Sequence, residues 1–302
     1  MNPTLPARCA RLLAVVAFTL TAVAAQDVAG NPAASLRTDI EYGQAAGESL
    51  RLDASIPPGN GPFAAVILVH GGGWTGGDKS GGPRKGYMAP MHAPLERAGL
   101  AWFSINYRLA PKHPFPACID DVMTAIRWVK AHAAEYRIDP SRIALAGESA
   151  GGHLVALAAV RADAATRVAA VVPFYGRFDL IDDLAPGAAL RSNYVALFGR
   201  KTLDDTARAA MYAASPLHQV RAGLPPFLLV HGTGDTTVPY QQSTLLQARL
   251  REHHVPSDLI TIKDGVHGMI SWDTVAPDYK QQVTTWLVRT LARNPAVPAT
   301  AR

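Results

Sequence analysis

The chain has 302 residues, of which 48% are hydrophobic and 18% charged, and its formal net charge at pH 7 is +5. This composition is typical of a soluble globular protein with a sizeable core. The lysine and arginine residues are scattered, which argues against a nucleic-acid-binding protein. No apolar run beyond the N-terminus reaches about 18 residues, so we expect no transmembrane helix.

Residues 1–25 have the pattern of an export signal. Arg8 and Arg11 precede the apolar run 12–23, and small residues follow it. This order is typical of a secretory signal peptide, and the alternative is a buried N-terminal helix. Cys9 precedes the apolar run, whereas a lipoprotein cysteine follows it, so we expect no membrane anchor. The sequence therefore predicts a periplasmic or secreted protein with a cleaved signal peptide.

After this segment we expect a linker over residues 26–45 and a single domain over 46–302. Residues 50–56 alternate between apolar and polar, as a half-buried strand does. Further strands are predicted at 64–69, 101–107, 143–146, 168–174, 227–230 and 258–262. Helices are predicted at 116–134, 150–160, 241–253 and 277–291. Strands that alternate with helices predict the α/β class, with a mostly parallel central sheet and helices on both of its faces.

Residues 176–216 interrupt this alternation. They show no strong strand signal, but they contain aromatic residues and one or two candidate short helices. We expect this insertion to form a small lid over the functional site.

The pentapeptide 147–151, Gly-Glu-Ser-Ala-Gly, matches the motif G-x-S-x-G and lies between a predicted strand and a predicted helix. In that context the serine occupies a tight turn, where crowding of the backbone requires glycine on either side. The helix N-terminus then points at a developing oxyanion. The pentapeptide alone occurs by chance in many proteins, so its context is what makes Ser149 the candidate nucleophile.

A glycine run follows the predicted strand 64–69, in the sequence His-Gly-Gly-Gly-Trp at 70–74. Consecutive glycines allow backbone N–H groups to turn toward a carbonyl oxygen. We therefore predict an oxyanion hole formed by the N–H groups of Gly72, Gly73 and Ala150. A merely flexible turn is the alternative, but it does not explain why the run lies between a buried strand and a downstream G-x-S-x-G motif.

The candidate acid and base follow the serine in the order Ser, Asp, His. Asp235 follows the predicted strand 227–230, and His267 follows the strand 258–262, so both lie at the carboxyl edge of the sheet. There His267 takes the proton of Ser149, and Asp235 orients the imidazole. Rival acids after the preceding strand are Asp179, Asp182 and Asp183.

Other polar residues of the predicted core are expected to be structural. We expect His70 and His231 to bind loop backbone and His153 to pack under the glycine loop. Asp120 and Asp121 begin a predicted helix and are expected to interact with its N-terminus or to form a salt bridge.

No metal or cofactor site is predicted. The chain contains no HExxH motif and no paired Cys/His spacing, and no GxGxxG follows a strand. Removal of the signal peptide leaves Cys118 as the last cysteine, so no internal disulfide can form. Cys118 lies in an apolar helix and is expected to be a core residue.

Several aromatic residues are candidates for lining a substrate pocket: Trp74, Tyr175, Phe178, Tyr194 and Trp272. Such a pocket would suit an aryl group or a sugar ring, although each side chain is equally consistent with core packing. Trp74 is the substrate-binding candidate. A compact lid without a long apolar insertion argues against a lipase for long acyl chains.

Together these motifs identify a resemblance. HGGGW at 70–74, NYRLAP at 106–111 and GESAGG at 147–152 resemble the hormone-sensitive-lipase-like esterases of the α/β-hydrolase superfamily. GGGWTGGDK at 71–79 and HGTGDTTVP at 231–239 look closer to the bacterial feruloyl and acetyl-xylan esterase-like hydrolases. The similarity extends from about residue 50 to residue 291.

The resemblance implies an α/β-hydrolase fold and a serine carboxylesterase that forms an acyl-enzyme. Its substrates would be short-chain acyl or aryl esters, as small molecules or linked to plant polysaccharide. Glu148 replaces the usual aspartate of GDSAGG, and Asp235 lies in GDTTVP instead of a DPL motif, which leaves the substrate open. The alternatives are an arylformamidase-like amide hydrolase and a non-catalytic binding protein on the same fold. The oligomeric state is also open.

Overall fold

The structure is a computed structural model that describes residues 1, 34–81, 87–182 and 184–292. The predicted signal peptide, apart from Met1, lies outside the described residues. No described helix is long and apolar enough to span a membrane.

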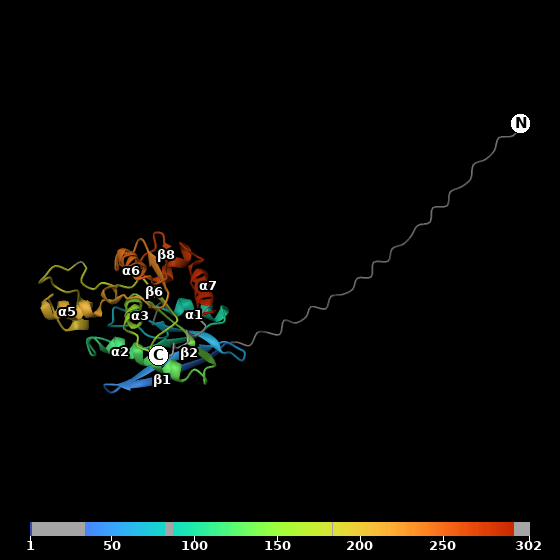
Figure 1. The fold of residues 1–302 in the computed structure, drawn as a ribbon, viewed down its shortest axis with the longest axis horizontal. Coiled ribbons are helices and arrows are strands. Elements are labelled where there is room, and N and C mark those ends of the chain that lie inside the picture. Colours follow the sequence, from blue (N-terminus) through green and yellow to red (C-terminus); the bar gives the residue numbers. More distant parts are fainter. Residues whose placement is uncertain (2–33, 82–86, 183, 293–302) are drawn as a thin grey trace, which may run out of the picture. The chain divides into compact units, whose positions relative to one another are not determined.

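In the described residues, eight strands form one sheet in the order β1-β2-β4-β3-β5-β6-β7-β8 (Figure 1). The strands are β1 (Ser35–Ala45), β2 (Glu48–Ile56), β3 (Phe63–Val69), β4 (Ala101–Ile105), β5 (Ile138–Glu148), β6 (Ala170–Phe174), β7 (Phe227–Gly232) and β8 (Ser257–Ile262). β1 and β4 pair antiparallel with β2, and all other neighbours are parallel. The prediction of a mostly parallel sheet is therefore confirmed.

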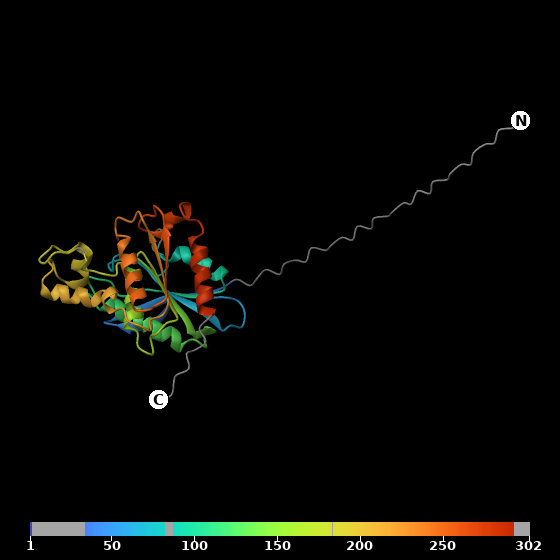
Figure 2. The same ribbon diagram turned by 45° about the horizontal axis from the view of Figure 1, so that its top comes forward.

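Helices cover both faces of the sheet (Figures 1 and 2). The α-helices are α1 (Ala89–Arg97), α2 (Ala117–Ala131), α3 (Ala150–Arg161), α4 (Ser192–Phe198), α5 (Asp205–Ala214), α6 (Gln241–Glu252) and α7 (Tyr279–Ala292), with short 3₁₀ helices at Pro216–Gln219 and Met269–Thr274. Buried side chains of α2, α3 and α6 belong to one hydrophobic cluster, and those of α1 and α7 to another. Ile67 and Leu68 of β3 lie in opposite clusters and are both fully buried, which explains why this strand is apolar without alternation.

Residues 26–33 of the predicted linker 26–45 lie outside the described residues, and the prediction is wrong for 35–45. Residues 35–45 form β1, an edge strand that pairs with β2 along its length. Tyr42 is its one fully buried residue, and the Tyr42 hydroxyl donates to the Asn106 carbonyl oxygen at 2.5 Å. An edge strand exposed on most of its surface carries no apolar pattern, so this sequence resembled a linker.

Helix α1 was also not predicted. Its sequence contains Pro94 inside the helix as well as a proline in its first turn. Proline inside a helical pattern normally indicates a break. Burial of Met91 and Leu95 against α7 and the sheet stabilises the helix despite this.

The insertion 176–216 contains α4 and α5, in agreement with the one or two short helices expected there. In both views α5 lies at one end of the domain, far from α7 (Figures 1 and 2). Met211 of α5 is fully buried in the same cluster as α3. Whether this insertion acts as a lid stays a prediction.

The segment around Tyr107 supports the glycine loop 71–74. The Tyr107 hydroxyl donates to the His70 carbonyl oxygen at 3.1 Å. The Ala110 N–H donates to the Trp74 carbonyl oxygen at 2.9 Å. The backbone of the glycine loop is thus held by the segment that follows β4.

Arg108 and Asp121 anchor that supporting segment to α2. The Arg108 Nη2 and Nε atoms donate to the Asp121 carboxylate, with the shortest distance 2.7 Å, and Asp121 Oδ2 also accepts the Arg108 N–H at 2.8 Å. Asp121 is 1% exposed. Of the two roles expected for this aspartate, the structure shows the salt bridge, in which both carboxylate oxygens accept from Arg108.

Removing one partner of a buried ion pair leaves the other charge buried without compensation. We expect Asp121→Ala to lower the free energy of unfolding by about 3 kcal/mol in urea denaturation. Asp120→Ala is the matched control, because Asp120 is exposed on the same helical turn, and it should cost less than about 1 kcal/mol. Equal denaturation midpoints for the two variants would contradict this role for the ion pair.

Candidate active site

Ser149 occupies the tight turn between β5 and α3. Its backbone angles are φ 54° and ψ −115°, a conformation that L-residues rarely adopt. A Cβ atom on Gly147 would lie 2.5 Å from the Gly151 carbonyl oxygen, and one on Gly151 would lie 2.1 Å from the Val69 carbonyl oxygen. Backbone crowding therefore excludes any side chain at the two glycine positions of the motif, as predicted.

His267 and Asp235 reach this turn from the ends of β8 and β7. His267 Nε2 lies 3.0 Å from Ser149 Oγ, and His267 Nδ1 lies 2.7 Å from Asp235 Oδ2. Because an ionised carboxylate can only accept, Nδ1 carries the proton and Nε2 is left to accept from the serine hydroxyl. The structure thus brings the three predicted residues into one hydrogen-bonded chain.

The Asp235 side chain is fully buried. Its Oδ1 atom accepts the N–H groups of Thr237 and Val238, each at 2.9 Å. Burial alone would raise the pKa of this carboxyl group, but hydrogen bonds from His231, His267 and Val238 outweigh burial and hold the pKa below its usual value. Asp235 is therefore ionised across the neutral range.

A second histidine touches the same carboxylate. His231 Nε2 lies 3.0 Å from the Val238 carbonyl oxygen and 3.4 Å from Asp235 Oδ2, while Nδ1 lies 2.7 Å from Ser243 Oγ. A carbonyl oxygen only accepts, so Nε2 of His231 carries the proton and Nδ1 accepts from the Ser243 hydroxyl. The predicted backbone bond of His231 is confirmed, and its contact with Asp235 was not predicted.

The rival acids are occupied elsewhere. Asp179 Oδ1 lies 3.3 Å from His218 Nε2 and accepts the N–H of Ile181 at 3.1 Å. Asp182 Oδ1 lies 3.2 Å from Arg177 Nη1. Asp183 lies outside the described residues. Of the described candidates, Asp235 is the one that contacts His267.

The glycine loop forms the opposite wall of the site. Gly72 and Gly73 have φ angles of 98° and 62°, which glycine adopts without strain. A Cβ atom on Gly72 would lie 2.2 Å from the Gly76 carbonyl oxygen. Gly72, Gly73 and Ala150 line the same pocket as Ser149, so the three predicted oxyanion donors and the serine share one cavity. Their role as donors stays a prediction.

Trp74 belongs to both the pocket wall and the core. It is 4% exposed, and its Nε1 atom donates to His153 Nδ1 at 3.2 Å. His153 Nε2 in turn lies 2.8 Å from the Ala214 carbonyl oxygen, and burial lowers the pKa of His153 to about 4. His153 is therefore neutral and packs under the glycine loop, as expected.

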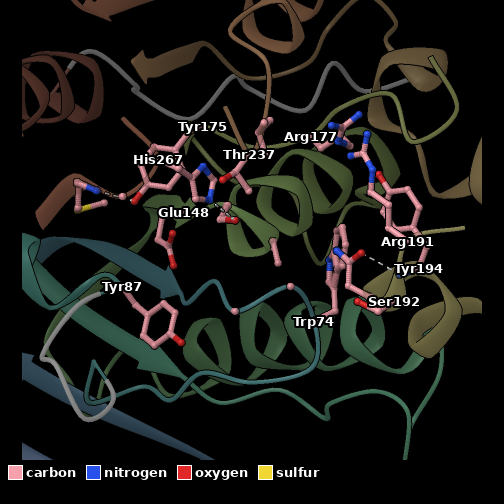
Figure 3. A pocket seen from close by; sticks show the side chains of 18 of the residues that line it. Trp74, Tyr87, Glu148, Tyr175, Arg177, Arg191, Ser192, Tyr194, Thr237 and His267 are labelled. Carbon is pink, nitrogen blue, oxygen red and sulfur yellow. Dashed lines mark hydrogen bonds between the residues drawn. The ribbon is translucent and has the colours of Figure 1, made fainter. Parts of the chain in front are cut away.

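The serine opens into a pocket of about 610 Å³ (Figure 3). Its apolar and aromatic walls come from Trp74, Tyr87, Tyr175, Tyr194, Val238, Met269 and Ile270. Its polar walls include Arg177, Arg191, Ser192, Asn193 and Thr237. Two of the aromatic candidates, Phe178 and Trp272, are fully buried and do not line the pocket. In Figure 3, Arg177, Arg191 and Tyr194 lie together on the side of the pocket away from Glu148 and Tyr87.

Cys118 is buried, and burial raises the pKa of its thiol to about 12, in agreement with the predicted core role. Among the described residues, no group of three or more His, Cys, Asp or Glu side chains is arranged to hold a metal ion.

Curated proteins with similar sequences are named as esterases. The chain is 36% identical over 232 residues to LipM of Mycobacterium tuberculosis, named a probable carboxylic ester hydrolase, and this match covers 71% of the chain and 51% of that protein. It is 34% identical over 241 residues to esterase LipQ of the same organism, which covers 72% and 53%. The chain thus spans about half the length of these curated relatives.

Solved structures share the fold over most of the chain. A truncated carbohydrate esterase from gut microbiota has 27% identity and a TM-score of 0.75, and the match covers 88% of this chain and 99% of that one. Est2 from Thermogutta terrifontis, solved with butyrate, has 24% identity and a TM-score of 0.70, with 88% and 98% covered. The BD-FAE family model matches residues 52–250, which include the glycine loop, Ser149 and Asp235. The chain has the α/β-hydrolase fold and belongs to the BD-FAE family.

Proposed function

We propose that the protein is an exported serine carboxylesterase that hydrolyses short-chain acyl or aryl esters. The observation that carries this proposal is the chain from Ser149 Oγ through His267 to Asp235, with distances of 3.0 and 2.7 Å. The serine lies on a strained turn, opposite a glycine loop and at the wall of a pocket. The esterase names of the similar proteins support the same chemistry.

In the proposed reaction Ser149 Oγ attacks the ester carbonyl while His267 Nε2 accepts the serine proton. Asp235 stabilises the imidazolium that forms. The backbone N–H groups of Gly72, Gly73 and Ala150 stabilise the oxyanion. His267 then donates the proton to the leaving alcohol, and water hydrolyses the acyl-enzyme by the same sequence of steps.

Acetyl or feruloyl esters of plant polysaccharide are the proposed natural substrates. A pocket of about 610 Å³ has the size of typical small-molecule sites. Its polar wall of Arg177, Ser192, Asn193 and Thr237 suits a hydroxyl-rich alcohol. The similarity to a carbohydrate esterase supports this substrate class.

Export is proposed from the pattern of residues 1–25, in which Arg8 and Arg11 precede the apolar run. Cleavage near residues 24–26 is expected when the full chain is expressed in a Gram-negative host. N-terminal sequencing of the protein from the periplasmic fraction tests this, and an intact Met1 in the cytosolic fraction would contradict it.

We expect Ser149→Ala to lower kcat/KM for p-nitrophenyl acetate by about 10⁴-fold or more, because the nucleophile is lost. The midpoint of thermal unfolding should be unchanged or higher. A fluorophosphonate probe should label the wild-type protein and not the variant. Turnover retained by the folded variant would contradict the proposed function.

Asp179 provides a matched control for the role of Asp235 as the acid. Asp235→Asn should lower kcat by about 10⁴-fold, because the amide no longer holds the imidazole in the required tautomer. Asp179→Asn keeps an oxygen acceptor at the rival position and should change kcat by less than about 3-fold. The reverse order of effects would transfer the role of the acid to Asp179.

A panel of acetyl, butyryl, octanoyl and feruloyl esters tests the substrate class. We expect acetyl and feruloyl esters to have the highest kcat/KM and octanoyl esters the lowest, because the pocket is compact and partly polar. Rates on phenyl acetate and N-formylkynurenine separate an esterase from an arylformamidase-like enzyme. Faster hydrolysis of N-formylkynurenine would overturn the esterase assignment.

A further inference from the structure

Glu148 lies between the nucleophile turn and the glycine loop. Its Oε1 atom accepts the Gly71 N–H at 2.6 Å, and the residue is 5% exposed. A Cβ atom on Gly71 would lie 2.0 Å from the same oxygen. The carboxyl group is therefore packed directly against the first residue of the loop that carries Gly72 and Gly73.

The other side of Glu148 faces the histidine loop through Tyr175. The Tyr175 hydroxyl interacts with the Glu148 carboxyl group. The same hydroxyl accepts the Met269 N–H at 3.0 Å, two residues after His267. The Tyr175 ring also packs edge-on against the imidazole of His267, with a centroid distance of 4.9 Å. Figure 3 shows Glu148 next to Tyr175 and His267.

A carboxyl group in this position requires a physical explanation. Burial disfavours its ionised form, and the described contacts include no lysine or arginine. The ionisable groups that interact with Glu148 are Tyr175 after β6, His267 after β8 and Tyr107 after β4. Burial raises the pKa of Glu148 to about 7, although the Gly71 N–H, His267 and Tyr175 each lower it. Buried carboxyl groups in such surroundings occur preferentially at functional sites.

We propose that Glu148 is a positioning residue that holds the oxyanion loop through Gly71 and, through Tyr175, ties that loop to the loop of His267. This inference rests on the proposed hydrolase function. The donors of Gly72 and Gly73 act only if they point at the oxyanion that develops. His267 acts only if Nε2 stays within reach of Ser149. Glu148 contacts the supports of both elements.

Glu148→Ala tests the positioning role. Loss of the acceptor for Gly71 should lower kcat by about 10- to 100-fold with little change in KM, because loop alignment matters in the transition state. Binding of a trifluoromethyl ketone, which forms an oxyanion on Ser149, should weaken by a similar factor. A folded variant with kcat within about 3-fold of wild type would overturn the inference.

Glu148→Gln keeps an oxygen acceptor and removes the ionisation, so it remains informative even where Glu148→Ala fails to fold. We expect kcat within about 5-fold of wild type. Binding of the trifluoromethyl ketone should likewise stay close to wild type, because the amide oxygen still accepts the Gly71 N–H. A loss of kcat of about 10-fold or more in Glu148→Gln would overturn the role of this acceptor.

Tyr175→Phe tests the second connection. It removes the acceptor of the Met269 N–H and leaves the bond from Glu148 to Gly71 intact. We expect a larger loss of kcat for alkyl acetates than for p-nitrophenyl acetate, because poor leaving groups depend on the proton from His267. Tyr279→Phe is the matched control, since the Tyr279 hydroxyl donates to the Met269 carbonyl oxygen without contacting Glu148. Equal losses for both esters, or the same pattern in the control, would overturn the connection.

Unfolding experiments test the ionisation independently of activity. With a folded pKa of about 7 against an ordinary value of 4.5, the protonated carboxyl group stabilises the fold fully below pH 4.5. That contribution is lost as the pH rises through about 7. Wild-type stability should therefore fall between pH 5 and pH 8 relative to Glu148→Gln. Parallel stability curves would contradict the titration. A failure of the proposed function can be distinguished from a failure of this inference, because it would appear as turnover retained by Ser149→Ala.

Discussion

The close approach of α3 to the carboxyl ends of the central strands is the constraint on which the site depends. A Cβ atom on Gly151 would lie 2.1 Å from the Val69 carbonyl oxygen of β3, and one on Gly152 would lie 2.6 Å from the Phe174 carbonyl oxygen of β6. The helix therefore begins in backbone contact with two strands. This places its N-terminal N–H groups at the sheet edge and forces Ser149 into a positive φ angle. Loops from neighbouring strands can then reach the serine.

Those loops are held mainly by buried polar groups. A loop at a sheet edge carries backbone N–H and C=O groups that need partners when water is excluded. His153 connects Trp74 to the Ala214 carbonyl oxygen, and His231 connects Asp235 and Val238 to α6. Each histidine has a donor on one nitrogen and an acceptor on the other, so each can bridge two loops without an unsatisfied atom. Apolar packing alone would not specify these loop positions.

A strand or helix can be predicted from the sequence when its own residues determine it. Buried parallel strands are apolar on both faces, so β3, β6 and β7 were recognisable without any partner in view. β1 has one fully buried residue, Tyr42, and this strand forms because it pairs with β2, which no local sequence pattern indicates.

The same distinction applies to the residues of the site. Ser149, Asp235 and His267 were found because each follows a core strand in a known order. The contact of His231 with Asp235, and the surroundings of Glu148, depend on how loops from several strands converge. The G-x-S-x-G motif does indicate that Glu148 must lie beside the serine, and this was the available signal.

The pKa values of the two carboxyl groups of the site are shifted in opposite directions. Asp235 receives hydrogen bonds from two histidines and two backbone N–H groups, which keep its pKa low despite burial. Glu148 accepts one backbone N–H and interacts with the Tyr175 hydroxyl, but burial has the larger effect and raises its pKa. Environments that separate two such pKa values assign the roles of the two groups. A fixed negative charge thus lies behind His267, where an imidazolium would form in the proposed reaction. The carboxyl group beside the glycine loop has a pKa of about 7, so it is protonated in mildly acidic solution and ionises through the neutral range. In the proposed reaction Asp235 therefore supplies a constant charge for the imidazolium, whereas the charge next to the oxyanion depends on pH.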